Sequence, residues 1–302
     1  MDSHSRTPKV SLGLPIYNAE KYLDGCLRNI LGQTFRDFEL IISDNCSTDG
    51  TQAICQAAAA ADPRVRYLRA DANNGASWNF NRVLELARSD YFKWVAYDDL
   101  LSPDYLERAV HSLDTHPEII LAYGNTVIID ATGKEVENRP DGIAIVGRKP
   151  SQRLREYLFK VGYTNAIYGV MRTATLRRTS GLEAYPGSDV VLLGELAVLG
   201  RFDEILPITF YRRIHPAASA PSNPSLNQLA AWWKPSHATN LILPKWQHLR
   251  GYSAAIRRSP WGALDKLRCF FVLLAWNRFM LPELGREAVL AARYKMSRGT
   301  PA

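Results

Sequence analysis

The sequence predicts an α/β protein with a mostly parallel sheet, and two observations carry this prediction. Over residues 1–125, short apolar runs alternate with segments of helical spacing about ten residues long. Strands that alternate with helices in this way are typical of βαβ units, whose right-handed crossovers make successive strands parallel. At 302 residues and 46% hydrophobic composition, the chain can bury a large core in one domain or two.

The elements of the first part follow one another regularly. Each predicted strand is a short apolar run that ends at a polar turn, and each predicted helix has an apolar face or a run of alanines. Asn18 is the expected cap of the first helix, and Ser102 with Pro103 marks the expected start of a later one. The predicted strands are 10–16, 38–42, 65–68, 91–96 and 119–123, and the helices are one with an apolar face from 22 to 31, then 51–61, 76–86 and 106–113.

After Asn125 the pattern changes. A hairpin turns at Gly133, and the remaining chain has the spacing of helices and shorter strands. The segment 217–227 is rich in Ala, Pro, Ser and Asn, which is typical of a flexible connection or a lid. The predictions are a hairpin over 127–136, helices over 151–160 and 189–199, extended segments over 166–171 and 202–211, and a helical tail.

Asp98 and Asp99 stand where the apolar run 91–97 stops. Open parallel sheets bind ligands beyond the carboxyl ends of their strands. Two neighbouring carboxylates there repel each other and resist desolvation unless a cation joins them. A hard divalent metal that also holds phosphate oxygens is the favoured explanation. The alternative, a helix cap, is disfavoured because Ser102 already suits that role.

Charge is distributed unevenly along the chain. Residues 230–302 contain twelve lysines and arginines and three acids, a net charge of +9, whereas the whole chain carries +7. This asymmetry suggests a polyanionic partner for the tail. No apolar stretch reaches the roughly 18 residues that span a bilayer, and the first residues lack a signal-peptide core. The four cysteines have no metal-ligand spacing, which fits a reducing cytosol.

A series of ordered motifs resembles the family 2 glycosyltransferases, enzymes with the GT-A fold. The resemblance covers roughly residues 9–219 and leaves the tail outside it; its motifs lie at 14–18, 39–51, 73–75, 93–99, 188–196 and 211–215. It implies a Rossmann-like, mixed and mostly parallel sheet flanked by helices, with a nucleotide-sugar-binding half over 1–125 and an acceptor-binding half with a lid over 126–229. The helical spacing and charge of the tail add a basic, helical C-terminal extension over 230–302.

The resemblance implies a nucleotide-sugar site on the first half. Asp44 would contact the nucleobase, with a turn as the alternative, since Asp bonds readily to its own backbone. Pro15 and Tyr17 would line the cleft for the base and ribose, although Tyr17 could equally be a packing residue. Gly75 would let the backbone approach the nucleotide, with a plain turn as the alternative. The implied nucleotide-sugar-binding residues are Pro15, Tyr17, Asn18, Asp44, Asn74, Gly75, Asp98 and Arg213, and the sequence does not choose between Arg213 and its neighbour Arg212.

The resemblance also implies a metal site and a catalytic base. Asp98, Asp99 and His215 would hold Mg²⁺ or Mn²⁺, although the acid that usually precedes this pair is replaced here by Tyr97 and Ala96. Which of the two aspartates touches the metal and which touches ribose therefore stays open. Asp189 would be the base that takes the proton of the acceptor hydroxyl. A helix cap is the alternative role for Asp189.

The function implied is an inverting, metal-dependent hexosyltransferase that uses a UDP-sugar and acts on a saccharide or lipid-linked acceptor. Assembly of cell-surface polysaccharide or glycolipid is the expected process. A sugar-1-phosphate nucleotidyltransferase and a non-catalytic nucleotide-sugar-binding scaffold are the alternatives. The first of these would carry a Gly-rich segment after its first strand, where Pro15 to Asn18 stand instead.

Residues 261–278 form an apolar segment flanked by tryptophans and basic residues. Such a helix could lie in a membrane interface, which would give a cytoplasmic protein a peripheral position at the inner face of the plasma membrane. Packing on the catalytic domain or on a second copy in a homo-oligomer are equal alternatives. Nucleic-acid binding is disfavoured because no recognised module accompanies the charge.

Overall fold

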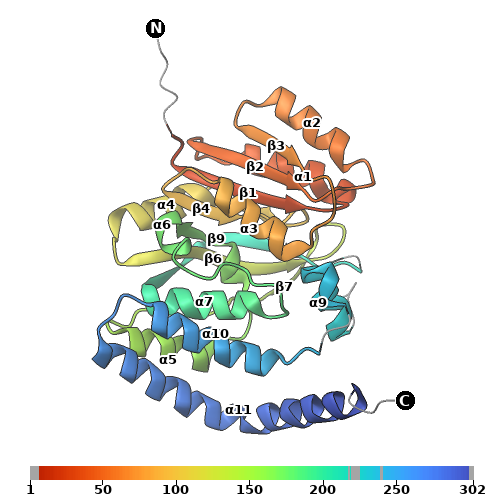
Figure 1. Ribbon diagram of the computed structural model, residues 1–302. Helices are drawn as coiled ribbons and strands as arrows, with labels where there is room; N and C mark the ends of the chain where they lie inside the picture. The colour runs from red at the N-terminus through yellow and green to blue at the C-terminus, as the bar shows by residue number, and fades with distance from the viewer. Residues whose placement is uncertain (1–6, 217, 219–224, 239–240, 299–302) are drawn as a thin grey trace.

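The computed structural model describes residues 7–216, 218, 225–238 and 241–298, with side chains of the last helix given up to residue 294 (Figure 1). The strands are β1 (Val10–Ile16), β2 (Phe38–Asp44), β3 (Val65–Arg69), β4 (Tyr91–Trp94), β5 (Leu100–Leu101), β6 (Ile119–Ile129), β7 (Glu135–Asn138), β8 (Val170–Arg172) and β9 (Arg201–Arg213). The helices are α1 (Glu20–Leu31), α2 (Thr51–Ala61), α3 (Ala76–Leu86), α4 (Tyr105–Thr115), α5 (Pro150–Lys160), α6 (Thr173–Leu176), α7 (Ser188–Leu199), α9 (Leu226–Trp233), α10 (Pro244–Arg258) and α11 (Ala263–Arg298), with short 3₁₀ turns η1 (Asn165–Tyr168) and η2 (Pro235–His237).

The described strands form one nine-stranded sheet in the order β3-β2-β1-β4-β8-β6-β9-β5, with β7 paired to β6. Strands β1, β2, β3 and β4 are parallel. Strand β8 is antiparallel to both β4 and β6, so β6 runs in the same direction as β4, and β9 is parallel to β6. The carboxyl ends of β1, β2, β3, β4, β6 and β9 therefore lie along one edge, which is called the carboxyl edge below. The predicted mixed, mostly parallel sheet is confirmed.

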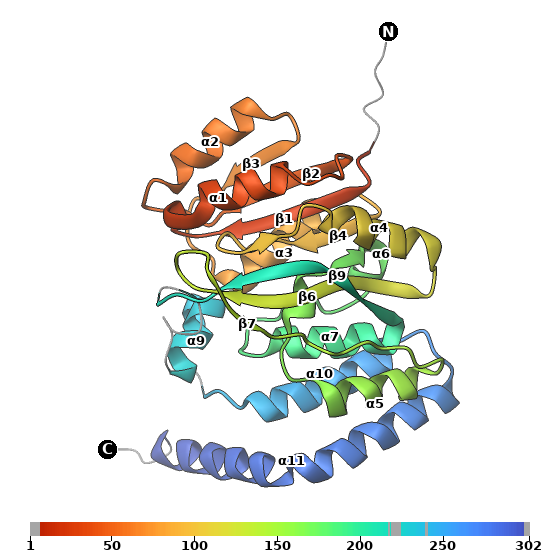
Figure 2. The same ribbon diagram turned by 180° about the vertical axis from the view of Figure 1, so that it is seen from behind.

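Helices cover both faces of this sheet. One face packs on α1, α2 and α4, and the other packs on α3, α6 and α7 (Figures 1 and 2). Helices α5 and α10 lie against α7, and α11 lies against α5 and α10 as the outermost layer. Because strand side chains alternate, each face has its own apolar core. Leu12 and Leu14 face the first of these cores, and Phe92 and Trp94 face the second.

Most predicted elements of the first part are confirmed, with boundaries that differ by a few residues. Strand β4 ends at Trp94, two residues before the predicted end, and β6 extends through the predicted hairpin strand to Ile129. The segment predicted as extended over 166–171 is instead η1 followed by the short β8. The predicted helical tail is confirmed by α9, α10 and α11.

Two predicted helix caps are wrong. Asn18 has a backbone φ of 50°, and its Oδ1 accepts a hydrogen bond from Thr48 N at 2.9 Å rather than from the start of α1. Ser102 Oγ accepts a hydrogen bond from Thr209 N at 3.1 Å, on the neighbouring strand β9. In both cases the side-chain oxygen was predicted to accept a hydrogen bond from a helix N-terminus. It accepts one instead from a backbone N–H that is distant in sequence.

The basic tail is integrated with the domain. The hydroxyl of Tyr157 donates to Val190 O at 2.6 Å, and Tyr252 of α10 packs beside it against the same helix α7. The carboxylate of Glu287 on α11 accepts hydrogen bonds from Lys245 N and Trp246 N at 3.0 and 3.3 Å, which satisfies free N–H groups at the start of α10. The tail thus extends the layer that supports α7.

The predicted lid over 217–227 falls largely outside the described residues, because 217 and 219–224 are not among them. Its last residues begin α9, whose N-terminus is capped reciprocally by Ser225 and Gln228. In the described ranges, no helix has both the length and the apolar character needed to cross a bilayer.

Candidate active site

Hydrogen bonds join the loops that follow β1 and β2 at the carboxyl edge. Asn18 N donates to Ser47 Oγ at 2.9 Å, and Thr48 N donates to Asn18 Oδ1 at 2.9 Å. Tyr17 is 43% exposed beside them, whereas Pro15 is buried in β1. These predicted nucleotide-binding residues therefore lie at the carboxyl edge, where open parallel sheets bind their ligands.

Asp44 ends β2 with its carboxylate fully buried. Oδ1 accepts a hydrogen bond from Ser47 N at 2.8 Å, and Oδ2 accepts one from the Tyr67 hydroxyl at 2.8 Å and lies 3.4 Å from Arg69 Nε. Burial, and then the hydrogen bond to Asp44, raises the pKa of Tyr67, which keeps that hydroxyl a donor. A carboxylate offers about four acceptor positions, so one position remains for a further donor, although Asp44 is shielded from solvent.

The turn after β3 is held by Asn45. Its Nδ2 donates to Asn73 Oδ1 at 2.9 Å, and its Oδ1 accepts from Asn74 N at 3.0 Å. Gly75 has a φ of +86°, and a Cβ there would lie 2.6 Å from Trp233 O. The close backbone approach at Gly75 is therefore made by the end of α9, while Asn74 remains exposed at the edge.

Asp98 and His215, 117 positions apart, meet at the carboxyl edge. His215 Nε2 lies 3.0 Å from Asp98 Oδ2, and their side chains are 2% and 14% exposed. The Tyr22 ring packs on the imidazole with a centroid distance of 4.7 Å. His215 Nδ1 is buried and makes no hydrogen bond with the residues that the structure describes. The parallel course of β4 and β9 produces this pair, because both residues follow strands that end at the same edge.

Asp99 has a different partner. Its Oδ1 accepts a hydrogen bond from Arg213 N at 2.7 Å, and burial, followed by the charge of Asp98, raises its pKa well above the usual value. Beneath it, the ammonium of Lys93 donates to Tyr168 O, and burial lowers the pKa of Lys93 to about 7 while the charge of Asp99 opposes that shift. Across the described ranges, no three His, Cys, Asp or Glu side chains gather as a metal-binding group, so the predicted trio is not assembled.

The Arg213 guanidinium holds the acidic loop in place. Nε donates to Asp98 O at 2.8 Å, one terminal nitrogen donates to Asp130 O at 3.0 Å, and the group lies 4.9 Å from the centroid of the Tyr22 ring. Two of its donors are therefore committed to the protein backbone. A guanidinium has five N–H donors, so three of them are not used in these two contacts.

Asp189 lies in the first turn of α7 and is partly exposed. Its Oδ2 accepts a hydrogen bond from Thr164 Oγ1 at 2.9 Å. The next residue, Asn165, accepts from a terminal nitrogen of Arg212 at 2.8 Å and donates to Asp141 Oδ1 at 2.7 Å. These contacts link the predicted base, Asp189, to Arg212 of β9. Arg212 directly precedes Arg213, which holds the loop of Asp98 and Asp99.

Tyr168 was not predicted and lies among the acids of the site. Burial chiefly, and then the charge of Asp99, raises its pKa, and the charges of Asp98 and Asp189 act in the same direction. Its ring stacks on Phe210 with a centroid distance of 5.3 Å. The charges of all three acids therefore act on the Tyr168 hydroxyl, and the charge of Arg212 opposes them. No sequence signal distinguishes this residue from the other tyrosines.

Asp141 was also not predicted. It is 8% exposed and accepts a hydrogen bond from Ala166 N at 2.6 Å. Burial raises its pKa to about 6, and the charge of Glu204 adds to this shift. Asp141 lies in the irregular segment between β7 and α5, where periodicity gives no prediction. Its position beside Asn165 makes it a support for the turn that meets Asp189.

Comparison with known proteins identifies the family of this chain. The model of glycosyl transferase family 2 matches residues 11–181, which is more than half of the chain. The chain belongs to glycosyl transferase family 2. The resemblance predicted from the motifs is thereby confirmed.

Several curated relatives match parts of this family 2 chain. Chondroitin synthase of Escherichia coli is 34% identical over 133 residues, which cover 44% of this chain and 19% of that protein. The putative teichuronic acid biosynthesis glycosyltransferase TuaG of Bacillus subtilis is 37% identical over 101 residues, or 33% of this chain and 40% of TuaG. An uncharacterized protein of Sinorhizobium fredii, y4gI, is 28% identical over 225 residues, 72% of this chain and 23% of that protein. The chain thus spans less than half the length of each of these relatives.

Solved structures show the same fold. The fragment 1–349 of S. aureus TarS in complex with UDP-GlcNAc has a TM-score of 0.59 at 18% identity and covers 85% of this chain and 69% of that one. The mannosyltransferase PcManGT from Pyrobaculum calidifontis in complex with GDP-Man and Mn²⁺ has a TM-score of 0.52 at 17% identity, with 98% and 89% covered. The predicted GT-A type fold is confirmed.

Proposed function

We propose that this chain transfers a sugar from a UDP-sugar to an acceptor hydroxyl with inversion at the anomeric carbon. The observation that carries the proposal is the 3.0 Å contact between Asp98 and His215 at the carboxyl edge of a family 2 chain. The solved structures similar in fold hold UDP-GlcNAc or GDP-Man, which supports a nucleotide sugar as the donor.

A divalent metal fits the pair formed by Asp98 and His215. A carboxylate oxygen and an imidazole nitrogen 3.0 Å apart are at the separation that neighbouring positions of an octahedral ion require when its bonds are about 2.1 Å long. His215 Nδ1 is buried, so the ring is fixed mainly by Tyr22 and by this carboxylate. Mg²⁺ or Mn²⁺ bound there would neutralise charge on the diphosphate leaving group. Asp99, held by Arg213 N, would support the loop rather than ligate the metal.

The chain's own residues would position the reactants. Arg213 fixes the loop that carries Asp98 and would direct its remaining donors to the diphosphate. Asp189, held by the hydroxyl of Thr164, would take the proton of the acceptor hydroxyl as that oxygen attacks the anomeric carbon. A hydroxyl that donates to one carboxylate oxygen leaves the other oxygen available as the base.

The three parts of the chain have separate roles in this proposal. Residues 1–125 would bind the nucleotide with Pro15, Tyr17, Asn18, Asp44 and Asn74, and residues 126–229 would bind the acceptor beside α7. Residues 230–302 would support α7 through α10. The relatives named for chondroitin and teichuronic acid synthesis point to polysaccharide assembly as the process.

Substitution of Asp189 by Asn tests the base. We expect D189N to lose at least a hundredfold in transfer rate, because general base catalysis contributes about 10²–10⁴-fold. Binding of UDP with Mn²⁺, measured by calorimetry, should stay within twofold of wild type, because the hydrogen bond of Asp189 goes to Thr164 and not to the Asp98–His215 pair. E183Q, which removes an exposed acid just before α7, is the matched control. Transfer by D189N at the wild-type rate would remove this residue from the role.

A further inference from the structure

Helix α11 has one face that packs and one that does not. The packed face lies against α5 and α10 through Cys269, Leu273 and Leu284, which are 1%, 2% and 6% exposed. Trp246 Nε1 of α10 donates to Leu284 O at 3.1 Å, which ties the helix to the domain. The position of α11 on the molecule is therefore fixed by its inner face.

The outer face carries a row of large apolar side chains, which Arg278 and Gly285 interrupt. Successive positions of the row, these two included, are three or four residues apart, the spacing that places residues on one side of a helix. Each apolar member is more than half exposed: Leu264 (60%), Leu267 (51%), Phe271 (62%), Leu274 (61%), Leu281 (61%) and Val289 (52%). An exposed apolar row of this length on a soluble domain indicates an interaction surface.

Arginines accompany this row. Arg268, Arg278 and Arg293 each lie four residues after one of its apolar members. Within the described part of the chain, Arg278 and Arg293 make no ion pair, whereas Arg268 is paired with Asp265 at 3.2 Å. The acids of the helix are occupied elsewhere, since Glu283 pairs with Arg286 and Glu287 faces the start of α10. The outer face is therefore apolar and positively charged.

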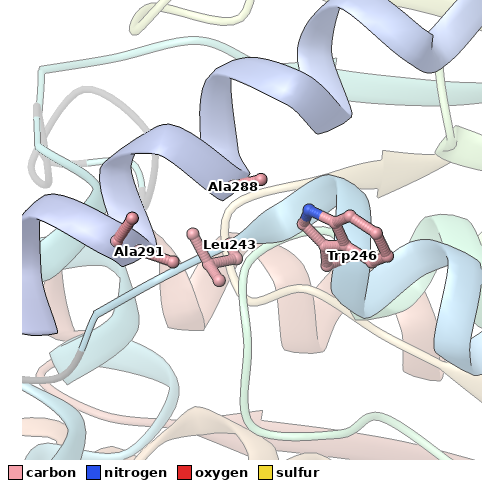
Figure 3. A pocket seen from close by; sticks show the side chains of 5 residues that line it. Leu243, Trp246, Ala288 and Ala291 are labelled. Atoms are coloured by element: carbon pink, nitrogen blue, oxygen red, sulfur yellow. The ribbon is translucent and has the colours of Figure 1, made fainter.

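The helix lies where a flat surface could reach it. In both views α11 is the outermost element on its side of the molecule, opposite α2 and β3 (Figures 1 and 2). Beside its C-terminal half is an open apolar hollow of about 390 Å³. Figure 3 shows Trp246 and Leu243 facing Ala288 and Ala291 of α11 across it, with Ala292 as the fifth lining residue. The hollow adds apolar surface next to the exposed row.

We propose that the outer face of α11 binds the interface of a membrane that contains anionic lipids. Apolar side chains would enter the headgroup boundary, and the arginines would extend their charged ends to lipid phosphates. A second copy of the chain is the competing occupant. It is disfavoured because a symmetric pairing of two such faces would bring unpaired arginines of both copies into one apolar contact. The inference does not rest on the proposed sugar transfer.

Vesicle co-sedimentation of the full chain tests this surface. We expect binding to vesicles of phosphatidylcholine mixed with phosphatidylglycerol, little binding to phosphatidylcholine alone, and weakening by salt. F271S/L274S should reduce the partition coefficient at least tenfold, since each side chain contributes about 1.5–3 kcal/mol when fully buried. R278Q/R293Q should reduce it about 25-fold on anionic vesicles only, because each basic residue contributes about 1 kcal/mol there.

L206S is the matched control, because Leu206 is 67% exposed on a different element, β9. It should bind vesicles as wild type does. All variants change exposed residues, so their melting temperatures should match that of wild type, and light scattering should show the same oligomeric state. Absence of wild-type binding to anionic vesicles would overturn the proposal. The proposal would also be overturned if the wild-type protein formed an oligomer that binds no vesicles and that F271S/L274S converts to monomers. That result would assign the outer face of α11 to a second copy of the chain.

Discussion

At the residue scale, the two neighbouring aspartates of the site have different environments. Asp98 is partly exposed and meets His215, whereas Asp99 is buried above Lys93 and receives a backbone N–H. The sequence predicts that two adjacent acids need compensating positive charge. It does not reveal that Lys93, buried within β4, supplies part of that charge. The alternation of a strand shows on which face of the sheet a residue lies, but it does not show which residues pack against that face.

Another buried titratable residue supports the start of α7. His248 of α10 lies against Gly187, which precedes α7, so that a Cβ on Gly187 would lie 2.4 Å from His248 Nε2. Burial, and then the charge of Lys245, lowers the pKa of His248 from 6.5 to about 4, although a hydrogen bond to Pro186 opposes the shift. The neutral imidazole is therefore the form that fits the fold.

This lowered pKa predicts a dependence of stability on pH. Between pH 6.5 and about 4 the unfolded chain binds a proton at His248 that the folded chain does not, so the free energy of unfolding falls as pH falls through this window. The loss should reach about 3 kcal/mol, at 1.36 kcal/mol per pKa unit. H248N keeps a donor toward Pro186 and cannot ionise. Urea unfolding at a series of pH values should show a smaller decline for H248N than for wild type, and equal declines would contradict the assignment.

At the element scale, α7 is held between the sheet and α10 by two glycines. A Cβ on Gly194 would lie 2.5 Å from Tyr252 and 3.0 Å from Tyr157, and one on Gly251 would lie 2.5 Å from Val191. The two helices therefore approach more closely than any larger residue permits. This contact makes the tail part of the support for Asp189, although the tail lies outside the family match.

Alanine at these glycines should destabilise the protein. We expect G194A and G251A each to lower the free energy of unfolding by about 1–3 kcal/mol, because added carbon overpacks a filled interior. The matched control is G285A on α11, where a Cβ would meet nothing within 4 Å. It should be neutral or gain up to about 1 kcal/mol from helix propensity. Equal effects of the three substitutions, measured by chemical unfolding, would show that the α7–α10 contact can relax.

The elements that the sequence predicts well are those with a clear apolar pattern or run. Helices α2 and α3 have the predicted boundaries, as does β1. The caps at Asn18 and Ser102 were wrong because their partners, Thr48 and Thr209, lie far away in sequence. Strand β8 is three residues long, too short for periodicity to show, and its place between β4 and β6 follows from pairing alone.

At the scale of the whole molecule, the sheet brings residues of distant segments to one edge. Parallel order predicts that the ends of β1, β2, β3 and β4 lie together, and the structure confirms this. The arrival of β9 beside β6 could not be read from the sequence, since register in a sheet depends on long-range pairing. His215 was therefore predicted as a site residue from the resemblance alone. Neither spacing nor composition predicts its contact with Asp98.

A ligand at this edge should stabilise the whole chain. UDP with Mn²⁺ at a hundred times its dissociation constant should raise the free energy of unfolding by about 2.7 kcal/mol, with a corresponding rise in Tm. Among UDP-, GDP- and dTDP-sugars, the preferred donor should raise Tm most at equal concentration. In D98N the part of the shift that depends on Mn²⁺ should disappear, because His215 loses the neighbouring carboxylate.

The control for this thermal shift is D71N, which removes an exposed carboxylate in the turn after β3. It should keep the shift that depends on Mn²⁺, each variant being compared with its own Tm without ligand. A wild-type Tm that no nucleotide sugar moves with Mn²⁺ present would contradict donor binding at the carboxyl edge. A full metal-dependent shift in D98N would instead place the ion away from the Asp98–His215 pair and would leave the proposal of nucleotide binding intact. The first outcome thus tests binding of the donor, and the second tests the position of the metal.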